Sequence, residues 1–252
     1  MVYLMVEQQF AKYPWCQRAI RGIFEEVRKR RIHVQEVSEL PGGAEERSCV
    51  LLVGASEEWI NQTARGAGSL GLHPIVLSNR ETNSSGLSVS SVKMDIHSSM
   101  ELAVDYLRTL GRERLALFGV NPSASSDLWR ARRFGELTGR EGDVFFLGSS
   151  VNEIFDQFYE KIHRYDGVIC ASDYAAVSLV GRLREKNYAI PEKLYVVGYG
   201  DMFLSRLFRP SITSISDDYE SFGKAALAIC AMMEKNDAFS VVSVKLKSRL
   251  HI

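Results

Sequence analysis

The chain has 252 residues, of which 46% are hydrophobic and 25% charged, an ordinary globular composition with ample material for a core. Its 31 basic and 31 acidic residues give a formal net charge of zero, which argues against a nucleic-acid-binding domain, because such domains usually carry a basic surface. No apolar run approaches the roughly 18 residues that span a bilayer, so we expect no membrane contact.

Apolar runs and amphipathic segments alternate from the first residues onward. The run at 2–6 predicts a strand, and residues 15–31 place apolar side chains at helical spacing. Further strands are expected at 49–55, 74–78, 90–96, 114–120, 143–148, 167–171, 194–199, 211–215 and 240–247. Helices are expected at 57–70, 98–111, 125–137, 173–186 and 219–235, and another is expected to follow the strand at 143–148 and end at about residue 164.

This alternation predicts the α/β class, with mostly parallel sheets that carry helices on both faces. The strands are too many for one compact doubly wound sheet in a chain of this length, so we expect two such sheets. In open parallel sheets, ligands bind outside the carboxyl ends of the strands. Here those ends are small, polar and mostly uncharged, which suits hydrogen bonding to a polyhydroxylated or otherwise polar small molecule.

Several motifs that would indicate catalysis or metal binding do not fit their surroundings. The Gly-rich segment at 66–71 matches a dinucleotide-binding pattern, but it closes a predicted helix instead of opening one. None of the five histidines has a second ligand at metal-binding spacing, and no nucleophile elbow exists. The basic run at 28–31 ends a helix, where the dipole favours cations. We therefore expect no enzyme activity, no cofactor and no metal.

The four cysteines, Cys16, Cys49, Cys170 and Cys230, show no paired spacing. We expect buried free thiols, which suit a reducing cytoplasm. The first ten residues lack the basic start and the length of a signal peptide. Both observations predict a cytoplasmic protein.

Longer stretches resemble one known family. Residues 166–201, "DGVICASDYAAVSLVGRLREKNYAIPEKLYVVGYGD", are followed by "RPSITSI" (209–215) and "YESFGKAALAICAMM" (219–233). These segments resemble the effector-binding core of the LacI/GalR family of bacterial transcriptional regulators. The stretches "VKMDIHSSMELAVDYLRTLGRERLALFG" (92–119) and "VYLMVEQQFAKYPWCQRAIRGIFEEVRKR" (2–30) resemble earlier parts of that core. Together they cover nearly the whole chain in the family's order and spacing.

The resemblance implies a periplasmic-binding-protein type I fold, with two doubly wound parallel-sheet lobes joined by three hinge crossovers. It places residues 1–120 plus 217–239 in an N-terminal lobe and 121–216 plus 240–252 in a C-terminal lobe. Regulators of this family carry a DNA-binding helix-turn-helix before the core, and no such segment is found in this chain.

The implied function is that of a ligand-sensing domain of a LacI-family repressor. It would bind a small polar effector, such as a sugar derivative, in the interlobe cleft. It would reach operator DNA only through a head that this chain lacks. The alternative is an extracytoplasmic solute-binding protein of a sugar transporter, against which stand the missing signal peptide and the segment at 209–215. We also expect a homodimer, because the helix at 173–186 has more apolar residues than one sheet-facing stripe requires.

The resemblance also carries ligand-binding positions onto this sequence. Arg130 matches an arginine that holds ligand oxygens, and a guanidinium there can bind hydroxyls or a carboxylate. Ser126 lies on the preceding turn. The first loop, where the family places apolar or aromatic ligand contacts, contributes Phe10, Tyr13 and Trp15.

Four further positions depart from the family pattern. Ser78 and Ser172, the latter followed by Asp173, replace an aspartate and an asparagine, and Asp217 falls where many members have glutamine. Gly200 replaces an aspartate that accepts hydrogen bonds from sugar hydroxyls, so we expect weak binding of simple neutral hexoses. We further expect Asp201 to cap the next short helix. Arg130 and Asp217 are then the principal charged groups expected to face the ligand.

Overall fold

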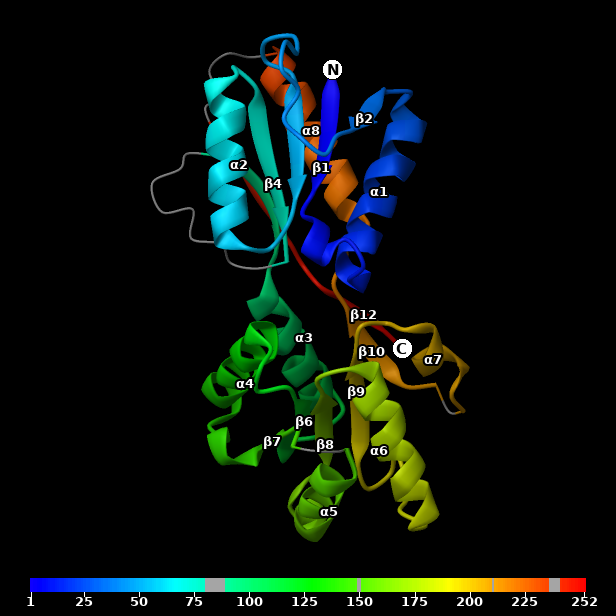
Figure 1. Cartoon of the computed structure of the whole chain (residues 1–252). Coiled ribbons are helices and arrows are strands. Elements are labelled where there is room, and N and C mark those ends of the chain that lie inside the picture. The colour runs from blue at the N-terminus through cyan, green and yellow to red at the C-terminus, as the bar shows by residue number, and fades with distance from the viewer. Residues whose placement is uncertain (80–88, 149–150, 210, 236–240) are drawn as a thin grey trace. The chain divides into compact units, whose positions relative to one another are not determined.

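The computed structural model describes residues 1–79, 89–148, 151–209, 211–235 and 241–252 (Figure 1). The chain forms two compact units, and each is described here by itself. Unit 1 comprises residues 1–94 and 218–246, and unit 2 comprises residues 95–217 and 247–252. The chain passes from one unit to the other after Met94, Asp217 and Leu246. The number of crossovers is the three that the resemblance implies, but their positions differ.

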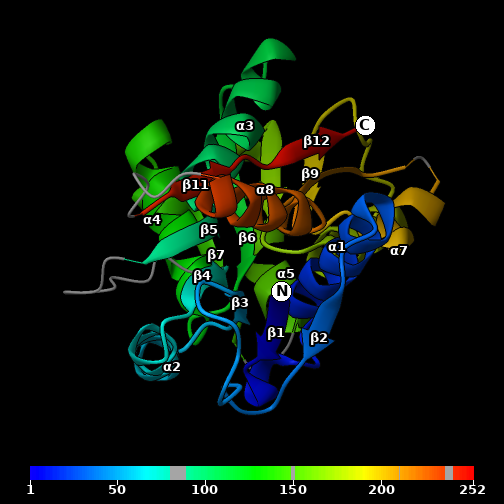
Figure 2. The same ribbon diagram turned by 90° about the horizontal axis from the view of Figure 1, so that it is seen from above.

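Unit 1 is built on a six-stranded, all-parallel sheet in the order β11-β5-β4-β3-β1-β2. Buried residues alternate between its two faces, as the pleat of a strand requires. In β3, Leu51 packs with α1 and α8, while Leu52 packs with α2 (Figure 2). The strands are β1 (Val2–Val6), β2 (Val34–Glu36), β3 (Cys49–Val53), β4 (His73–Ser78), β5 (Ser90–Met94) and β11 (Ser243–Leu246); the α-helices are α1 (Pro14–Arg30), α2 (Glu57–Ser69) and α8 (Ser221–Lys235).

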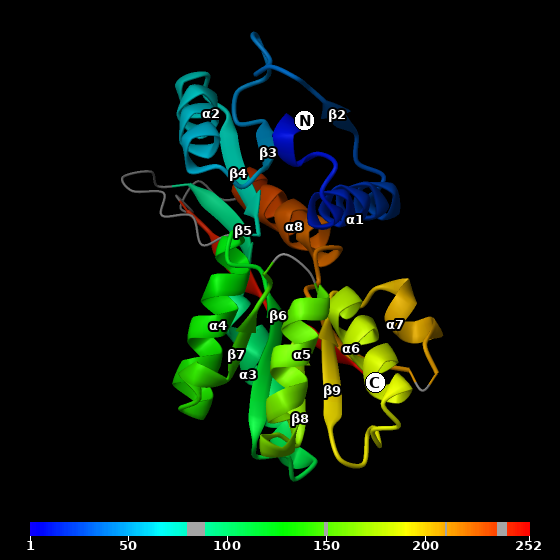
Figure 3. The same ribbon diagram turned by 60° about the horizontal axis from the view of Figure 1, so that its bottom comes forward.

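Unit 2 has a second six-stranded sheet in the order β12-β10-β9-β8-β6-β7, in which only the β10–β12 pair is antiparallel. Helices α5 and α6 pack on one face and α3 and α4 on the other (Figure 3). The strands are β6 (Leu115–Val120), β7 (Val144–Phe146), β8 (Gly167–Cys170), β9 (Tyr195–Tyr199), β10 (Thr213–Ser216) and β12 (Arg249–His251); the α-helices are α3 (Ile96–Thr109), α4 (Ser125–Thr138), α5 (Val151–Lys161), α6 (Asp173–Glu185) and α7 (Phe203–Leu207).

The predicted fold class is confirmed, but the lobe boundaries differ from those expected. The sequence placed residues 95–120 in the first lobe, whereas α3 and β6 belong to unit 2, because β6 pairs with β7 and β8. The sequence placed residues 240–252 in the C-terminal lobe, whereas residues up to Leu246 belong to unit 1, because β11 pairs with β5. Strands β2 and β12 were not predicted; each has three residues at a sheet edge and no fully buried side chain.

The apolar residues of helix α6 on which the dimer expectation rested lie mostly inside unit 2. Its residues Ala175, Ala176, Leu179, Val180 and Leu183 are all buried in the core of unit 2. The helix contacts α5 and α7 as well as β8 and β9, so it is covered on more than its sheet-facing side. The high apolar content of α6 therefore reflects burial inside the unit, and that argument for a dimer was wrong.

Helices α1 and α8 approach each other so closely that two glycines are required at their contact. A Cβ on Gly22 would lie 2.0 Å from the carbonyl oxygen of Glu220, and one on Gly223 would lie 2.3 Å from the carbonyl oxygen of Gly22. Beside this contact, Arg18 donates two hydrogen bonds of 2.8 Å to the Glu220 carboxylate. The pair of glycines thus fixes how α8 packs in unit 1.

The buried Glu7 carboxylate joins the end of β1 to the start of α2. It accepts hydrogen bonds from the backbone N–H groups of Ala55 (2.9 Å) and Ser56 (3.0 Å), and from the side chains of Ser56 and Gln9. Burial by itself would raise the pKa of Glu7, but these hydrogen bonds outweigh it and the pKa is lowered. Glu7 therefore stabilises unit 1 as an ionised carboxylate at a helix N-terminus.

We expect Glu7→Gln to lower the free energy of unfolding at neutral pH by about 1–3 kcal/mol, because the amide cannot accept all of these hydrogen bonds. The pKa of Glu7 is lower in the folded protein than in the unfolded chain. The carboxylate's contribution to the free energy of unfolding is therefore complete at pH values above the unfolded-state pKa. This contribution is lost as the pH falls through the folded-state pKa. Urea unfolding of the wild type and of Glu7→Gln at a series of acidic pH values should show that the difference between their free energies of unfolding shrinks as the pH falls. Exposed Glu25→Gln is the control, and a difference that stays constant into acid would contradict this role.

Candidate functional site

Arg130 lies within α4 and its guanidinium is held by its own unit. Its Nη1 donates a hydrogen bond of 2.7 Å to Asp127 Oδ1, one turn earlier on the helix. Its Cζ lies 3.8 Å from the centroid of the Tyr199 ring, at the end of β9. Only 11% of the side chain is exposed. Arg130 is thus fixed by an ion pair on one side and a cation–π contact on the other.

Asp217 completes this arrangement from the end of β10. Its Oδ1 accepts hydrogen bonds from the Tyr199 hydroxyl (2.6 Å) and the Ser248 hydroxyl (2.7 Å), and the residue is 3% exposed. We call Asp127, Arg130, Tyr199, Asp217 and Ser248 the Arg130 cluster. Burial raises the pKa of Tyr199 and Asp217 adds to this, although Arg130 acts in the opposite direction. The phenol is therefore a hydrogen-bond donor throughout the physiological range.

The charges of the Arg130 cluster are one cation and two carboxylates, a net of one negative charge. Burial would lower the pKa of Arg130, but Tyr199, Asp217 and Asp127 outweigh this and raise it. The guanidinium is therefore permanently charged and already compensated inside the protein. This changes the expectation that Arg130 is available to a ligand carboxylate, because an anion near this cluster would meet net negative charge.

The expected ligand residues Ser172 and Asp173 have structural partners in unit 2. The Ser172 hydroxyl accepts a hydrogen bond of 3.2 Å from the backbone of Ala175 and caps α6. Asp173 is fully buried and accepts hydrogen bonds of 2.6 Å from both the Ser214 hydroxyl and the Met202 backbone. Ser172 thus caps its own helix, while Asp173 joins the turn after β9 to β10.

Gly200 has a φ of +121°, a conformation that side chains rarely adopt, so the turn after β9 itself requires glycine. The expectation that Asp201 caps the next helix was wrong. Helix α7 has Met202 at its N-cap without a side-chain cap, and the Met202 N–H instead reaches Asp173. With φ at +48°, Asp201 directs its carboxylate to Arg206, whose Nε donates a hydrogen bond of 2.9 Å.

The aromatic residues of the first loop form a cluster in unit 1. The Phe10 ring lies 5.4 Å from the Tyr13 ring and 6.2 Å from the Trp15 ring, between centroids. Trp15 is buried and contacts Tyr219, while 52% of Tyr13 is exposed. Of the three expected aromatic contacts, Tyr13 therefore presents the most surface to a ligand.

Polar groups gather at the carboxyl ends of β1 and β3 in unit 1. They border an open hollow of about 530 Å³, whose lining includes Gln8, Gln9, Ser56, Trp59 and Gln62. The sequence predicts polar, mostly uncharged strand ends, whereas the lining of this hollow also includes the carboxylates of Glu7 and Glu58. Ser78, at the end of β4, is fully buried.

The structure brings the expected Arg130 and Asp217 into one cluster, while Ser126 lies half-buried in the first turn of α4. Sequence reasoning missed Asp127, Tyr199 and Ser248. Asp127 stands three residues before Arg130, a spacing that predicts an ion pair on a helix. Ser248 carries no local signal, because it comes from a late segment of the chain.

The described residues contain neither a membrane-spanning helix nor a metal-binding group of side chains. Among the helices in the described parts of the chain, none combines the length and the apolar content that a bilayer crossing demands. Within the same residues, no three His, Cys, Asp or Glu side chains are grouped so that they could hold a metal ion.

Comparisons with known proteins agree on one family. The family model described as a periplasmic binding protein-like domain matches residues 104–251. The chain is 32% identical over 90 residues to the HTH-type transcriptional regulator RegA of Clostridium saccharobutylicum, covering 36% of this chain and 24% of that protein. It is 36% identical over 74 residues to the HTH-type transcriptional repressor PurR of Vibrio atlanticus (strain LGP32), covering 29% and 22%.

The same architecture occurs in solved structures. A complex of the transcriptional regulator CelR with cellobiose aligns over 100% of this chain and 83% of that chain, with a TM-score of 0.68 and 19% identity. At that identity the likeness concerns the fold. The matched segments span about a quarter of the length of the two curated relatives.

Proposed function

Because the chain belongs to the periplasmic binding protein-like domain family, we propose that it is the effector-sensing part of a LacI-type transcriptional regulator. The observation that carries the proposal is that the relatives over 30% identical, RegA and PurR, are named as regulators. These relatives also favour a regulator over a transporter's solute-binding protein. Operator DNA would be bound by a helix-turn-helix head outside this chain, which agrees with its zero net charge.

The effector we propose is small, polar and not anionic. Support comes from the Arg130 cluster, whose net negative charge opposes phosphates and carboxylates, and from the polar strand ends of unit 1. Carboxylate and hydroxyl oxygens, such as those of the Arg130 cluster and of the strand ends of unit 1, accept hydrogen bonds from hydroxyl or amine groups of a ligand. Tyr13 supplies an exposed aromatic face.

A thermal-shift panel of neutral sugars, their phosphates, nucleosides and amino acids tests this proposal. We expect the stabilising compound to be uncharged or cationic. Its phosphorylated form should bind at least about tenfold more weakly, because a like charge near the cluster costs on the order of 1 kcal/mol or more. Simple hexoses are expected to bind weakly, since Gly200 provides no side-chain acceptor. Tighter binding of a sugar phosphate or carboxylate would contradict the charge argument.

We propose that the regulator is a homodimer that uses exposed apolar side chains of unit 2. Tyr174 on α6 and Phe203 and Leu207 on α7 are 63%, 74% and 53% exposed. Phe203→Asp should shift the protein to monomer in sedimentation at tens of micromolar, because a charge replaces buried apolar area. Leu70→Asp, at an exposed position of unit 1, is the matched control. A wild-type protein that sediments only as monomer would refute the dimer.

A further inference from the structure

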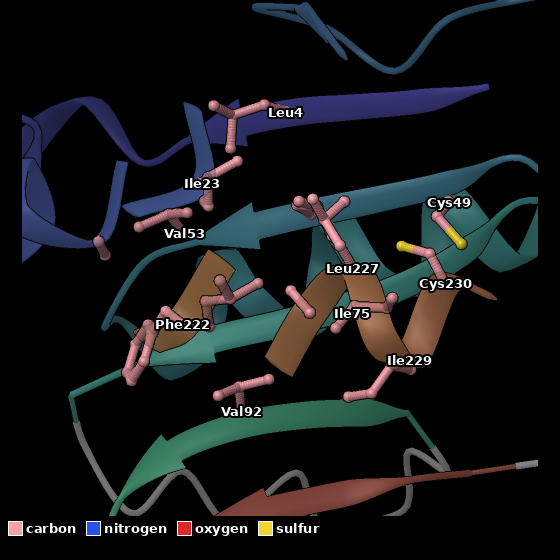
Figure 4. Close-up of a cluster of buried hydrophobic side chains, with 14 of the residues drawn as sticks. Leu4, Ile23, Cys49, Val53, Ile75, Val92, Phe222, Leu227, Ile229 and Cys230 are labelled. Atoms are coloured by element: carbon pink, nitrogen blue, oxygen red, sulfur yellow. The ribbon is translucent and has the colours of Figure 1, made fainter. Parts of the chain in front are cut away.

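Two cysteines that lie 181 positions apart in the sequence (230 − 49) meet in the core of unit 1. Cys49 is the first residue of β3, and Cys230 lies on the buried face of α8. Their exposed fractions are 2% and 3%. Figure 4 shows the two side chains next to one another, one from the strand and one from the helix, at one end of the hydrophobic cluster.

This contact makes the two sulfurs chemically unequal. The hydrogen bond with Cys230 lowers the pKa of Cys49, although burial opposes it. The same contact, together with burial, raises the pKa of Cys230. Of the two sulfurs, Cys49 therefore has the greater tendency to lose its proton, with Cys230 as the neighbouring hydrogen-bond donor. A thiolate is the form that reacts with oxidants.

For the other two cysteines, Cys16 and Cys170, the surroundings raise the thiol pKa and so disfavour the thiolate. Burial raises the pKa of Cys16 to about 11, with a further contribution from the Glu7 charge. Burial and the Asp173 charge raise the pKa of Cys170, which lies in unit 2. Both are buried free thiols and serve as internal controls for the pair.

We propose that Cys49 and Cys230 are a redox-sensitive pair, which hydrogen peroxide converts into an intramolecular disulfide linking β3 to α8. The Cys49 thiolate attacks one peroxide oxygen, the O–O bond breaks, and the leaving hydroxide takes a proton to become water. The resulting sulfenic acid is attacked by the Cys230 sulfur, which forms the S–S bond and releases a second water. Two thiols and one peroxide thus give one disulfide and two waters.

The position of the pair suits this chemistry. Cys49 begins its strand, and its N–H donates a hydrogen bond of 3.2 Å to the carbonyl of Met1, a residue that is 54% exposed. Cys49 therefore lies at the first residue of its strand, next to the exposed start of the chain. The disulfide would tie down α8, the helix that begins shortly after the chain enters unit 1 at Asp218.

The test is oxidation of the folded protein with hydrogen peroxide, followed by thiol counting after unfolding and by peptide mass spectrometry without reductant. We expect the four free thiols to fall to two, with the loss of the mass of two hydrogen atoms and one linked peptide pair carrying Cys49 and Cys230. Dithiothreitol should restore all four. Four remaining thiols, or a linkage that involves Cys16 or Cys170, would overturn the proposal.

Variants separate the pair from general thiol oxidation. In Cys230→Ser the disulfide should be lost, and dimedone should instead trap a sulfenic acid at Cys49. In Cys16→Ser the disulfide should form at the wild-type rate. Circular dichroism confirms that each variant is folded before oxidation. If Cys230→Ser leaves dimedone labelling absent at Cys49 while the protein is folded, Cys49 is not the reactive thiolate and the proposal fails.

Discussion

Arg130→Ala is expected to lower the free energy of unfolding of unit 2 by about 3–5 kcal/mol, because it leaves the Asp127 and Asp217 carboxylates buried without their cation. The resemblance implies only that Arg130 holds ligand oxygens. The buried position of the guanidinium changes that expectation, since the arginine is a structural group as well as a ligand candidate. Denaturant unfolding followed by circular dichroism measures the loss.

Arg132→Ala is the matched control for this experiment. Arg132 is two residues away on the same helix, and its side chain is 69% exposed. It pairs on the surface with Glu136 and lies 5.6 Å from the centroid of the Trp129 ring. Its removal should change stability by less than about 1 kcal/mol. If Arg130→Ala unfolds at the same denaturant concentration as Arg132→Ala, the Arg130 cluster does not stabilise the unit as described.

Gly223→Ala should destabilise unit 1 by about 3 kcal/mol or more, the upper end of the range for overpacked cores. The added Cβ would meet the backbone of Gly22 and Ile23 in α1, and backbone atoms cannot move aside as a flexible side chain can. The two helices must therefore separate, which opens the core between them and the sheet. Urea unfolding of the purified variant is the measurement.

A second glycine-to-alanine change provides the comparison. Gly68 lies in α2 of the same unit, and a Cβ there would meet nothing within 4 Å. Because alanine favours the helix, Gly68→Ala should be neutral or stabilising by up to about 1 kcal/mol. Equal effects of the two substitutions would show that the α1–α8 contact is looser than described.

The fold was predictable from sequence because buried parallel strands and amphipathic helices leave strong periodic signals. The first crossover was placed too late, since nothing local distinguishes β6, which begins unit 2's sheet, from the strands of unit 1. The short edge strands β2 and β12 have little apolar pattern to detect. Local pattern thus specifies the elements, while their assignment to a sheet depends on long-range pairing.

The candidate site was predictable only in part. Arg130 and Asp217 were singled out by resemblance, but the resemblance could not show that they share Tyr199. Ser172 and Asp173 were expected to contact a ligand, and each has a structural partner that depends on loop geometry. The pairing of Cys49 with Cys230 was equally hidden, because it joins a strand and a helix that are distant in sequence.

The most direct test of the proposed sensing function is the operator affinity of this chain joined to the DNA-binding head that the proposal assumes, measured with and without the ligand found in the thermal-shift panel. Saturating ligand should change the Kd for operator DNA by about fivefold or more, as coupled sites do. An operator Kd that is the same with and without saturating ligand would contradict the claim that this chain is the effector-sensing domain of a regulator.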